Sequence, residues 1–481
     1  MQVHDNTASA RFVVTDHGRG MAGQSGLGLV AELSDALGLT AGLCEATRGS
    51  RSWLVHNPGK VLRDVALTLV AGGDALRHMA VMATRPEVFG AVGSAATACR
   101  TIAAVAGDEH MAGAIAAARR LARETAWQAG GAPPVVARAW ARDRDPAAGA
   151  AGSDGGVDVD GVGEPLAMDL DATLSIAHSD DKDGAGATYK GSWGFHPLLC
   201  YLDRGDGLGE ALAGVLRPGN AGANNAADHV TVFDEAAWQL PELPAGVRRL
   251  VRTDSAGCSH VFLEHVRAAG WEFSVGFALA PEVKDAIRQL PEDAWVPAIT
   301  QDGEIREGAH VAELTGRFDL SGWPEGSRLL VRREPLHPGA QQTLEDVDGY
   351  RFTAFLTDQP DTDLAILDAR HRAHARVEDH IRAGKDTGLR TLPCDTFARN
   401  ALWLELVLIA QDLFTYLQVL TLEGQLRLAE PQQLRYKLLH TPGRVARRAR
   451  KLWLHIQGDW PWADDLVAAF ARLRALPLPA T

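Results

Sequence analysis

The sequence predicts an α/β protein whose central sheet is preceded by a helical domain, interrupted by a β-rich insertion and followed by a helical tail. Three observations lead to this prediction. Apolar residues recur at helical spacing through residues 20–125. Short apolar runs that end in acidic or turn residues alternate with helical stretches between residues 165 and 278. The chain has 481 residues, which is too long for one ordinary hydrophobic core.

Residues 1–128 are expected to form the helical N-terminal domain. A helix near residues 74–83, a turn at 85–90 and a helix capped by Ser94 have the outline of a helix-turn-helix. The second helix of such a motif enters the major groove of DNA, which makes Arg100 a candidate DNA contact. Ordinary helical packing explains the same pattern, so both interpretations stay open.

A boundary follows at residues 129–163, which are rich in Gly, Ala, Pro and Asp and show little apolar periodicity. This composition predicts a flexible linker.

Residues 164–280 and 361–425 are expected to form one α/β core. Three strand-like runs come first, and helical and strand-like stretches then alternate past the run that ends at Asp254. This order of elements is typical of a ribonuclease-H-like domain. Residues 281–360 break the pattern with short strand-like pieces, so we expect a β-rich insertion that forms a small domain of its own.

Three acidic residues are the strongest candidates for chemistry. Asp171 and Asp254 each end a strand-like run, and Glu378 lies in a charged helical stretch. Mg²⁺ prefers carboxylate oxygens, and two such ions can stabilise the attacking and the leaving oxygen of a phosphodiester displacement. The acids therefore predict a Mg²⁺ site for nucleic-acid strand chemistry, with Mn²⁺ as a substitute. Asp169 faces the same way as Asp171 on a strand and is either its neighbour in the site or the partner of a structural Arg.

The charge of the chain is unevenly distributed. A formal net charge of −13 argues against a uniformly basic surface for nucleic acid. The region 426–481 is nevertheless locally cationic, because residues 431–457 contain seven Lys and Arg residues and no acid. We expect a basic helical region that contacts phosphate or is a solvated helix face. Its candidate DNA contacts are Arg447, Arg448 and Lys451.

Composition also bears on the cellular compartment. The five cysteines include no closely spaced pair, which fits a reducing cytosol. The N-terminus shows no signal segment. The apolar stretch 401–420 contains Glu405 and Asp412, so we interpret it as a core helix and not as a membrane span. We therefore expect a cytoplasmic protein without membrane association.

The sequence resembles the DDE-type transposases of bacterial insertion sequences, in particular the family named after insertion sequence thirteen-eighty. Five segments that occur in the expected order carry the resemblance over nearly the whole chain. They are MDLDAT at 168–173, GFHPL at 194–198, LRPGNA at 216–221, VRTDSAG at 251–257 and VEDHI at 377–381.

The resemblance implies a ribonuclease-H-like catalytic core whose last acid lies on a helix after a β-rich insertion. It implies that Asp171, Asp254 and Glu378 are the catalytic metal ligands. It further implies a homodimer on double-stranded DNA, with terminal inverted repeats and target DNA as partners and the nucleoid as the place of action. A small residue and Thr after Asp171 favour it over Asp169 as the first ligand. The alternatives are a relic that only binds DNA and a nuclease of the same fold.

Related enzymes also have a Tyr, Arg, Glu, Lys pattern around the last acid. Glu378 and Lys385 keep that spacing, whereas His371 and His374 stand at the Tyr and Arg positions. The two histidines and Glu378 share a helix face, so a transition-metal site is an alternative to phosphate contact. The candidate phosphate contacts here are Arg252, His371, His374, Arg382 and Lys385.

Two tryptophans of the expected insertion are candidates for contact with a flipped base. Related enzymes use a Trp of the insertion to support a DNA hairpin, which points to Trp295 or Trp323. The alternative is that both rings form the core of a small β domain.

Overall fold

The structure is a computed structural model. It describes residues 20–50, 55–144, 163–336, 346–347, 349–449 and 451–478. Most of the expected linker therefore lies outside the described residues. Its first part is not a flexible linker, because α8 spans Pro134–Arg144, and Val136 is buried in the core of the central sheet.

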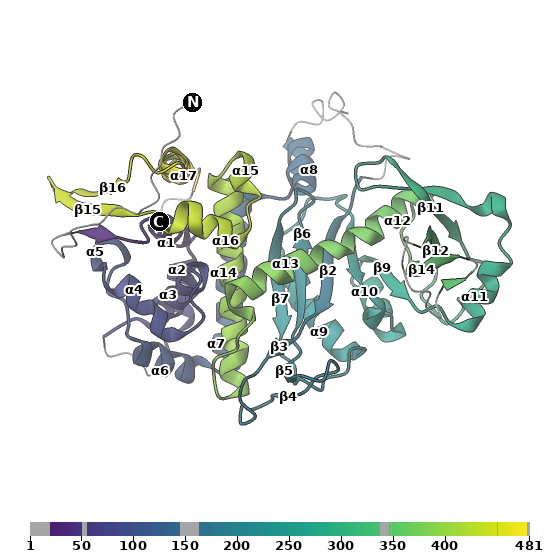
Figure 1. The fold of residues 1–481 in the computed structure, drawn as a ribbon, viewed down its shortest axis with the longest axis horizontal. Coiled ribbons are helices and arrows are strands. Elements are labelled where there is room, and N and C mark those ends of the chain that lie inside the picture. Colours follow the sequence, from purple (N-terminus) through teal and green to yellow (C-terminus); the bar gives the residue numbers. More distant parts are fainter. Residues whose placement is uncertain are drawn as a thin grey trace, which may run out of the picture.

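A mixed sheet forms the centre of the molecule (Figure 1). Its strand β2 (Leu166–Ala172) is antiparallel to β6 (Leu198–Asp203) and parallel to β8 (Arg249–Thr253). β7 (Gly209–Val215) pairs with the far side of β6, and β9 (Glu272–Phe277) pairs parallel with β8. The sequence correctly predicts the order of three strands followed by alternating helices and strands.

Alternation along β2 decides which residues lie on which face of the sheet. Met168 and Leu170 are buried in a core that they share with α9 (Ala226–Gln239). Asp169 and Asp171 therefore point to the opposite face, as the two-residue period of a strand requires. The core on the α9 side also includes α10 (His260–Ala268).

The β-rich insertion extends the central sheet and does not form a separate domain. Its strand β14 pairs antiparallel with β9, with Leu356 opposite Val275, and the order continues as β14, β12, β11, β10. The prediction of an independent domain was wrong because β9 would otherwise present an unpaired edge. The other elements are α11 (Pro281–Arg288), β10 (Val296–Ile299), β11 (Ile305–Glu313), β12 (Arg328–Pro335), β13 (Asp346–Val347) and β14 (Tyr350–Thr357).

After the insertion the chain crosses the sheet as a run of helices (Figure 1). The run consists of α12 (Leu364–Arg372), a 3₁₀ turn at Ala373–Ala375 and α13 (Arg376–Gly384). Asp363 caps the first helix, since its Oδ1 accepts a hydrogen bond from the Ala365 N–H at 2.8 Å. The run lies on the face to which Asp169 and Asp171 point.

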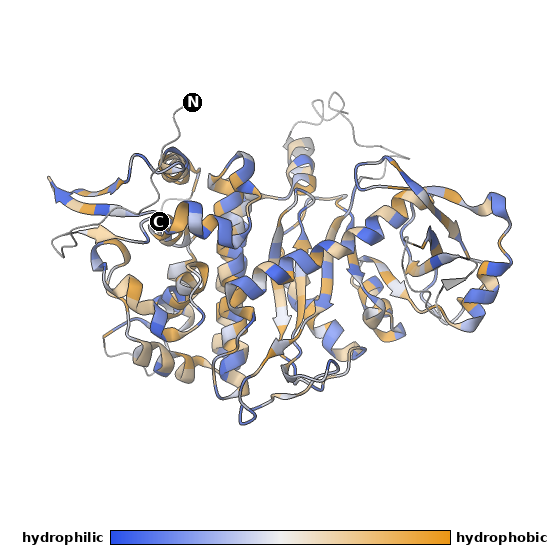
Figure 2. Ribbon diagram, viewed as in Figure 1, coloured by the Kyte–Doolittle hydropathy of each residue, from blue (hydrophilic) through white to orange (hydrophobic). Residues whose placement is uncertain are grey.

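The long helix α14 (Phe397–Thr421) packs between the sheet and the N-terminal helices. It contacts β7 on one side and α3 (Pro58–Val70) on the other (Figure 1). Figure 2 shows apolar residues along this helix and along the strands of the sheet. The helix is long and apolar enough to cross a membrane, but 89% of its apolar window is buried inside the protein. It is thus the core helix that the sequence predicts.

The N-terminal region is helical, as expected. Ser94 caps α6, since its Oγ accepts a hydrogen bond from the Thr97 N–H at 3.2 Å. The helix expected near residues 74–83 is a 3₁₀ turn followed by one short α-helix. The elements are α1 (Leu27–Ala36), α2 (Leu39–Ala46), the 3₁₀ turn Leu76–Met79, α4 (Ala80–Ala83), α5 (Pro86–Phe89), α6 (Ala95–Val105) and α7 (Glu109–Ala126).

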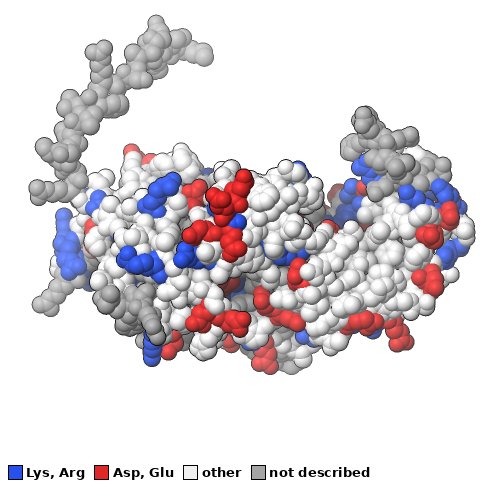
Figure 3. All heavy atoms as spheres, turned by 90° about the horizontal axis from the view of Figure 1, so that it is seen from below, with Lys and Arg blue, Asp and Glu red and all other residues white. Residues whose placement is uncertain are grey.

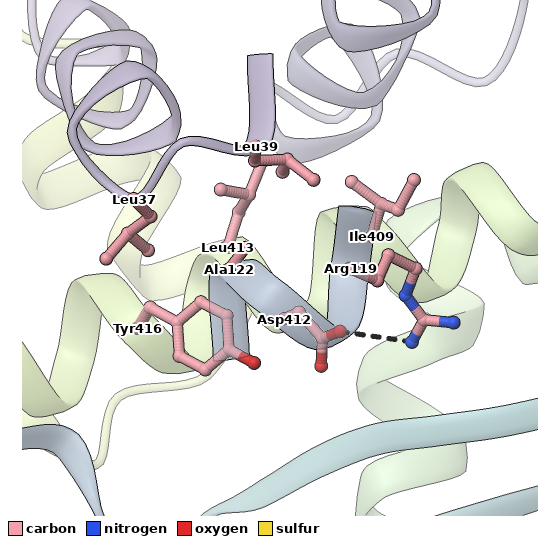
Figure 4. Close-up of a pocket in the computed structure, with 8 residues that line it drawn as sticks. All are labelled: Leu37, Leu39, Arg119, Ala122, Ile409, Asp412, Leu413 and Tyr416. Carbon is pink, nitrogen blue, oxygen red and sulfur yellow. Dashed lines mark hydrogen bonds and ion pairs between the residues drawn. The ribbon is translucent and has the colours of Figure 1, made fainter. Parts of the chain in front are cut away.

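Buried charges join these helices to the sheet. Arg123 on α7 pairs with Glu210 of β7 at 2.9 Å and with Asp412 of α14 at 2.8 Å. Arg119 reaches the same Asp412 at 3.0 Å, as Figure 4 shows. The cavity beside this pair measures only about 10 Å³, so the contact between the helices is closely packed.

The basic C-terminal stretch is a β-hairpin and not the expected helix. β15 (Gly443–Arg448) pairs with β16 (Lys451–Ile456), and β15 also pairs with β1 (Met21–Ala22). The helical prediction was wrong because Trp453 and Ile456 favour strands and Ala449, with φ 47°, makes a left-handed turn. The remaining helices are α15 (Gly424–Arg427), α16 (Pro431–Leu434) and α17 (Ala463–Ala475).

Candidate functional site

The ends of two neighbouring parallel strands place two of the predicted acids at one edge of the sheet. Leu170 of β2 is in register with Thr253 of β8, so Asp171 and Asp254 leave the sheet side by side. The Oδ1 atom of Asp254 also accepts a hydrogen bond from the Ala256 N–H at 2.9 Å, which fixes the turn after β8.

The third acid comes from the helix run that crosses the sheet. Glu378 is an exposed residue of α13, while Val377 and Ile381 on the same helix are buried against the interior. Burial is the largest effect on Asp171. Together with the negative charges of Asp254 and Glu378 it raises the pKa to about 6, against the lowering effects of His374 and the Ala172 N–H. The charges of the other two predicted acids therefore act on Asp171.

Such a set of carboxylates suits a hard divalent cation. Within the part of the chain that the structure describes, no three His, Cys, Asp or Glu side chains are already gathered as a metal cluster. The chemistry of the donors nevertheless fits, because Mg²⁺ takes carboxylate oxygens and its charge would favour the ionised form of Asp171, whose pKa is raised by burial and by the two other acids.

Asp169 belongs to a buried ion-pair network beside the acids. The Arg252 guanidinium donates to both of its carboxylate oxygens, at 2.8 and 2.7 Å, and also to Asp203 at 2.7 Å. His374 Nδ1 lies 2.8 Å from Asp169 Oδ1. Burial alone would raise the pKa of Asp169, but Arg252 and His374 lower it to about 2. Of the two interpretations, the structure supports Asp169 as the partner of a structural Arg.

Two predicted phosphate contacts are therefore corrected. Arg252 is only 3% exposed and is committed to carboxylates, so it is not available to DNA. His371 is also buried, with Nδ1 2.9 Å from Ser274 Oγ and its ring stacked on Phe355 at 4.4 Å. Burial lowers the pKa of His371 well below its usual value, so the ring is neutral and does not attract phosphate.

His374 remains next to the acids, but it has a different partner from the one expected. Its side chain is 15% exposed and hydrogen-bonded to Asp169, so it links the helix run to β2. With His371 turned to Ser274, the two imidazoles do not converge with Glu378. The alternative of a transition-metal site is not supported by these orientations.

Of the predicted phosphate contacts, Lys385 is the one best placed to contact a phosphate beside the acids. Burial lowers the pKa of its ammonium, Lys190 and Arg390 lower it further, and Asp171 raises it. Lys385 is thus within electrostatic reach of Asp171. Two cations that sequence reasoning missed, Lys190 and Arg390, also lie within electrostatic reach of Lys385. Their only sequence signal is the proximity of Arg390 to Lys385 along the chain.

The other predicted contacts near the acids are already engaged. Arg382 pairs with Asp379 at 2.9 Å and with Glu430 at 2.7 Å. Trp323 stacks on His260 with ring centroids 4.0 Å apart, so one face of its indole is occupied.

Trp295 is engaged in a similar way. The Arg333 guanidinium lies over its ring at 4.4 Å from the centroid. Both tryptophans pack against the core of the sheet.

A second group of cations lies where the insertion meets the helix run. An open pocket of about 380 Å³ is lined by Gln301, Arg306, Arg372, Ala373, Ala375, Arg376 and Asp379. Arg376 is held by Asp203 at 3.0 Å and by Gln301 at 3.1 Å. The sequence analysis did not single out these arginines, although Arg372 and Arg376 are four positions apart on either side of His374.

The remaining predicted contacts lie across α14 from the acids (Figure 1). Arg100 is exposed on α6, and Arg447, Arg448 and Lys451 are exposed on the β15–β16 hairpin. The structure therefore does not bring them into the site at the sheet edge.

Asp171 and Asp254 at neighbouring strand ends, with the charge of Glu378 acting on Asp171, form a candidate site for divalent cations. A family model described as transposase DDE domain group 1 matches residues 5–478, nearly the whole chain. The chain therefore belongs to this family of transposases. No curated protein matches the sequence.

Proposed function

We propose that the chain is an active insertion-sequence transposase of the group named after insertion sequence thirteen-eighty. It binds terminal inverted repeats and catalyses cleavage and transfer of DNA strands. Its core is ribonuclease-H-like, with strands in the order β7, β6, β2, β8, β9. It acts as a homodimer, because two transposon ends must be paired, and it works in the bacterial cytoplasm on nucleoid DNA.

The observation that carries the proposal is the parallel register of β2 and β8, which places Asp171 beside Asp254, while the charges of Asp254 and Glu378 both act on Asp171. These acids come from two strand ends and a helix, far apart in the sequence. In a member of a transposase family, this arrangement of acids is the best candidate for the catalytic centre.

Asp171, Asp254 and Glu378 would hold Mg²⁺, or Mn²⁺ in its place, which when bound supplies charge stabilisation at the phosphodiester oxygens. The protein's own contribution is positioning. Arg252 joins β8 to Asp169 on β2, and His374 joins the helix run to the same carboxylate. These links fix the acids relative to one another.

Cations beside the acids provide a place for the DNA backbone. Lys385 is half-buried near Asp171, and Lys190 lies close enough to lower its pKa. We propose that both ammonium groups contact phosphates next to the bond that is cut, which orients the strand.

A cleavage assay with a matched control tests the proposal. The full-length protein is incubated with a labelled duplex that carries the inverted repeat flanking its gene, with and without Mg²⁺. We expect cuts at the repeat boundary, and we expect Asp254→Asn and Glu378→Gln to reduce the rate by roughly a thousandfold or more, since a lost metal ligand removes several kcal/mol of transition-state stabilisation. Asp379→Asn, at the exposed position next to Glu378, should cut normally.

Other outcomes would point to the two alternatives. Repeat-specific binding without cleavage in Mg²⁺ or Mn²⁺ would indicate a DNA-binding relic. Metal-dependent cleavage that ignores the repeat would indicate a nuclease. Normal cleavage by Glu378→Gln would refute the assignment of the third acid.

A further inference from the structure

The β15–β16 hairpin has two chemically different faces. Cross-strand pairs alternate between the faces, so Arg444 with His455, Ala446 with Trp453 and Arg448 with Lys451 share one of them. We call this set the cationic face; its six residues are Arg444, Ala446, Arg448, Lys451, Trp453 and His455. The face contains three cations and an indole, and the hairpin contains no acid.

The second face turns toward the body of the protein at its base. Ile456 packs against the core formed by the N-terminal helices and α14. Gly443 lies so close to Ser25 that an added Cβ would stand 2.4 Å from the Ser25 Oγ. The cationic face is consequently the outward one near the body. At the tip the second face carries Arg447 and Leu452.

The cations of the cationic face differ in their pairing from those of the neighbouring helix. Within the described parts of the chain, no carboxylate pairs with Arg444, Arg448 or Lys451. On the neighbouring helix α17, by contrast, Arg472 pairs with Glu423 and Arg474 pairs with Glu32. In a chain of net charge −13, this concentration of unpaired positive charge would attract an external anion.

The aromatic residues of the face are also exposed. Trp453 is 49% exposed, and its ring lies nearly parallel to that of His455, with an interplanar angle of 9°. Figure 3 shows Lys and Arg side chains gathered at the end of the molecule where the hairpin lies. An exposed indole between cations is suited to a partner that combines negative charge with flat apolar surface.

We propose that the cationic face of the hairpin is a DNA-binding ribbon that lies along a groove of double-stranded DNA. This inference rests on the proposed function, which supplies DNA as the substrate. The major groove is about 12 Å wide and admits a two-stranded ribbon. Arg444, Arg448 and Lys451 contact phosphates, and Trp453 packs on the sugars and base edges between them. Arg447, on the other face, makes no phosphate contact.

Variants of equal charge on opposite faces test the proposal. The affinity of the full-length protein for the repeat duplex is measured by fluorescence anisotropy over a series of NaCl concentrations. Arg448→Gln and Lys451→Gln should each weaken binding and reduce the slope of log K against log[salt] by about 0.9, since each removes one phosphate contact. Arg447→Gln should leave affinity and slope unchanged.

A second pair of variants tests the indole. Trp453→Ala should weaken binding with an unchanged salt slope, because the indole carries no charge. Leu452→Ala removes a side chain of similar exposure, 47%, from the other face and should have no effect on affinity.

The charge variants also decide against the proposal in two cases. Equal losses of duplex affinity in Arg447→Gln and Arg448→Gln, or no loss of affinity in either, would overturn it.

The cleavage assay separates this inference from the proposed function. If the wild-type protein binds the duplex through the cationic face but never cuts it, the ribbon stands and the catalytic proposal fails. If the wild-type protein cuts at the repeat and all cationic-face variants bind and cut normally, the ribbon fails and the catalytic proposal stands.

Discussion

Asp169 and Asp171 lie two positions apart on one strand face, yet their surroundings give them opposite proton affinities. Arg252 and His374 overcome the effect of burial on Asp169 and lower its pKa to about 2. At Asp171, burial and two neighbouring acids outweigh the lowering effects of His374 and the Ala172 N–H, and the pKa rises to about 6. One residue is thus a permanent anion of the framework, whereas the other changes charge under mild conditions.

The raised pKa of Asp171 predicts that its charge destabilises the metal-free protein. The folded protein keeps a proton that the unfolded chain loses between pH 3.8 and about 6, so this residue's contribution to stability falls as the pH rises through that window. Asp171→Asn should therefore raise the free energy of unfolding at pH 8 by roughly 1–3 kcal/mol, and the gain should vanish near pH 4. Urea denaturation in EDTA at both pH values measures it. A variant less stable than wild type at pH 8 would contradict the assigned surroundings.

Arg252 is predicted to matter for folding and not for contact with DNA. Arg252→Gln would leave Asp169 and Asp203 buried without a full counter-charge, at a cost of about 3–5 kcal/mol. Arg382→Gln, which breaks exposed pairs, should cost at most about 1 kcal/mol. Denaturant unfolding of both variants measures the difference. A normally stable Arg252→Gln protein with weakened DNA binding would restore the original assignment.

At the scale of elements, the insertion is a continuation of the sheet. β14 is hydrogen-bonded to β9, so the backbone amides of both strands should exchange in the same opening event. Hydrogen–deuterium exchange should therefore show similar protection for peptides covering 272–277 and 350–357. Peptides from the exposed turn around 302–304 provide a fast-exchanging control. Complete exchange of β14 while β9 stays protected would mean that the insertion is independent.

The sequence predicted elements better than the partners of those elements. Alternation and strand-end acids were enough to find β2, β8 and the positions of Asp171 and Asp254. The pairing of β14 with β9 joins residues far apart in the chain, and no local pattern encodes it. Arg252 was misassigned for the same reason, because a buried Arg and a DNA-facing Arg look alike until Asp169 and Asp203 are brought next to it.

The basic hairpin shows a different limit of sequence reasoning. Charge made residues 431–457 conspicuous, but their seven cations suggested a basic helical region, for phosphate contact or as a solvated face, and concealed the strand pattern of LWLHI. The difference between a helix and a hairpin also matters for function. A helix would distribute its cations around an axis, whereas the two-residue period of a strand separates Arg447 from Arg448 and so creates a face.

At the scale of the whole molecule, α14 connects the two halves of the protein. Its residues share one core with the N-terminal helices and with α17, and the helix also packs on β7. Asp412 on α14 receives both Arg119 and Arg123 from α7. The N-terminal helices are therefore fixed to the sheet that carries the acids. Under the proposed function, DNA bound on the N-terminal side of α14 would be held in a defined position relative to the acids on the other side.

A cavity between α14 and the N-terminal helices should lower the stability of both halves of the protein together. Leu413 is fully buried on α14 and meets Leu37 and Leu39 of the N-terminal region beside the small cavity of Figure 4. Leu413→Ala should cost about 2–5 kcal/mol while unfolding remains a single transition. Hydrogen exchange should speed up in peptides from both α3 and β7, whereas Val467→Ala, at a position 56% exposed on α17, should change neither. If only α3 lost protection, the N-terminal helices would be a separate unit, and a rigid connection through α14 could not be what positions the DNA.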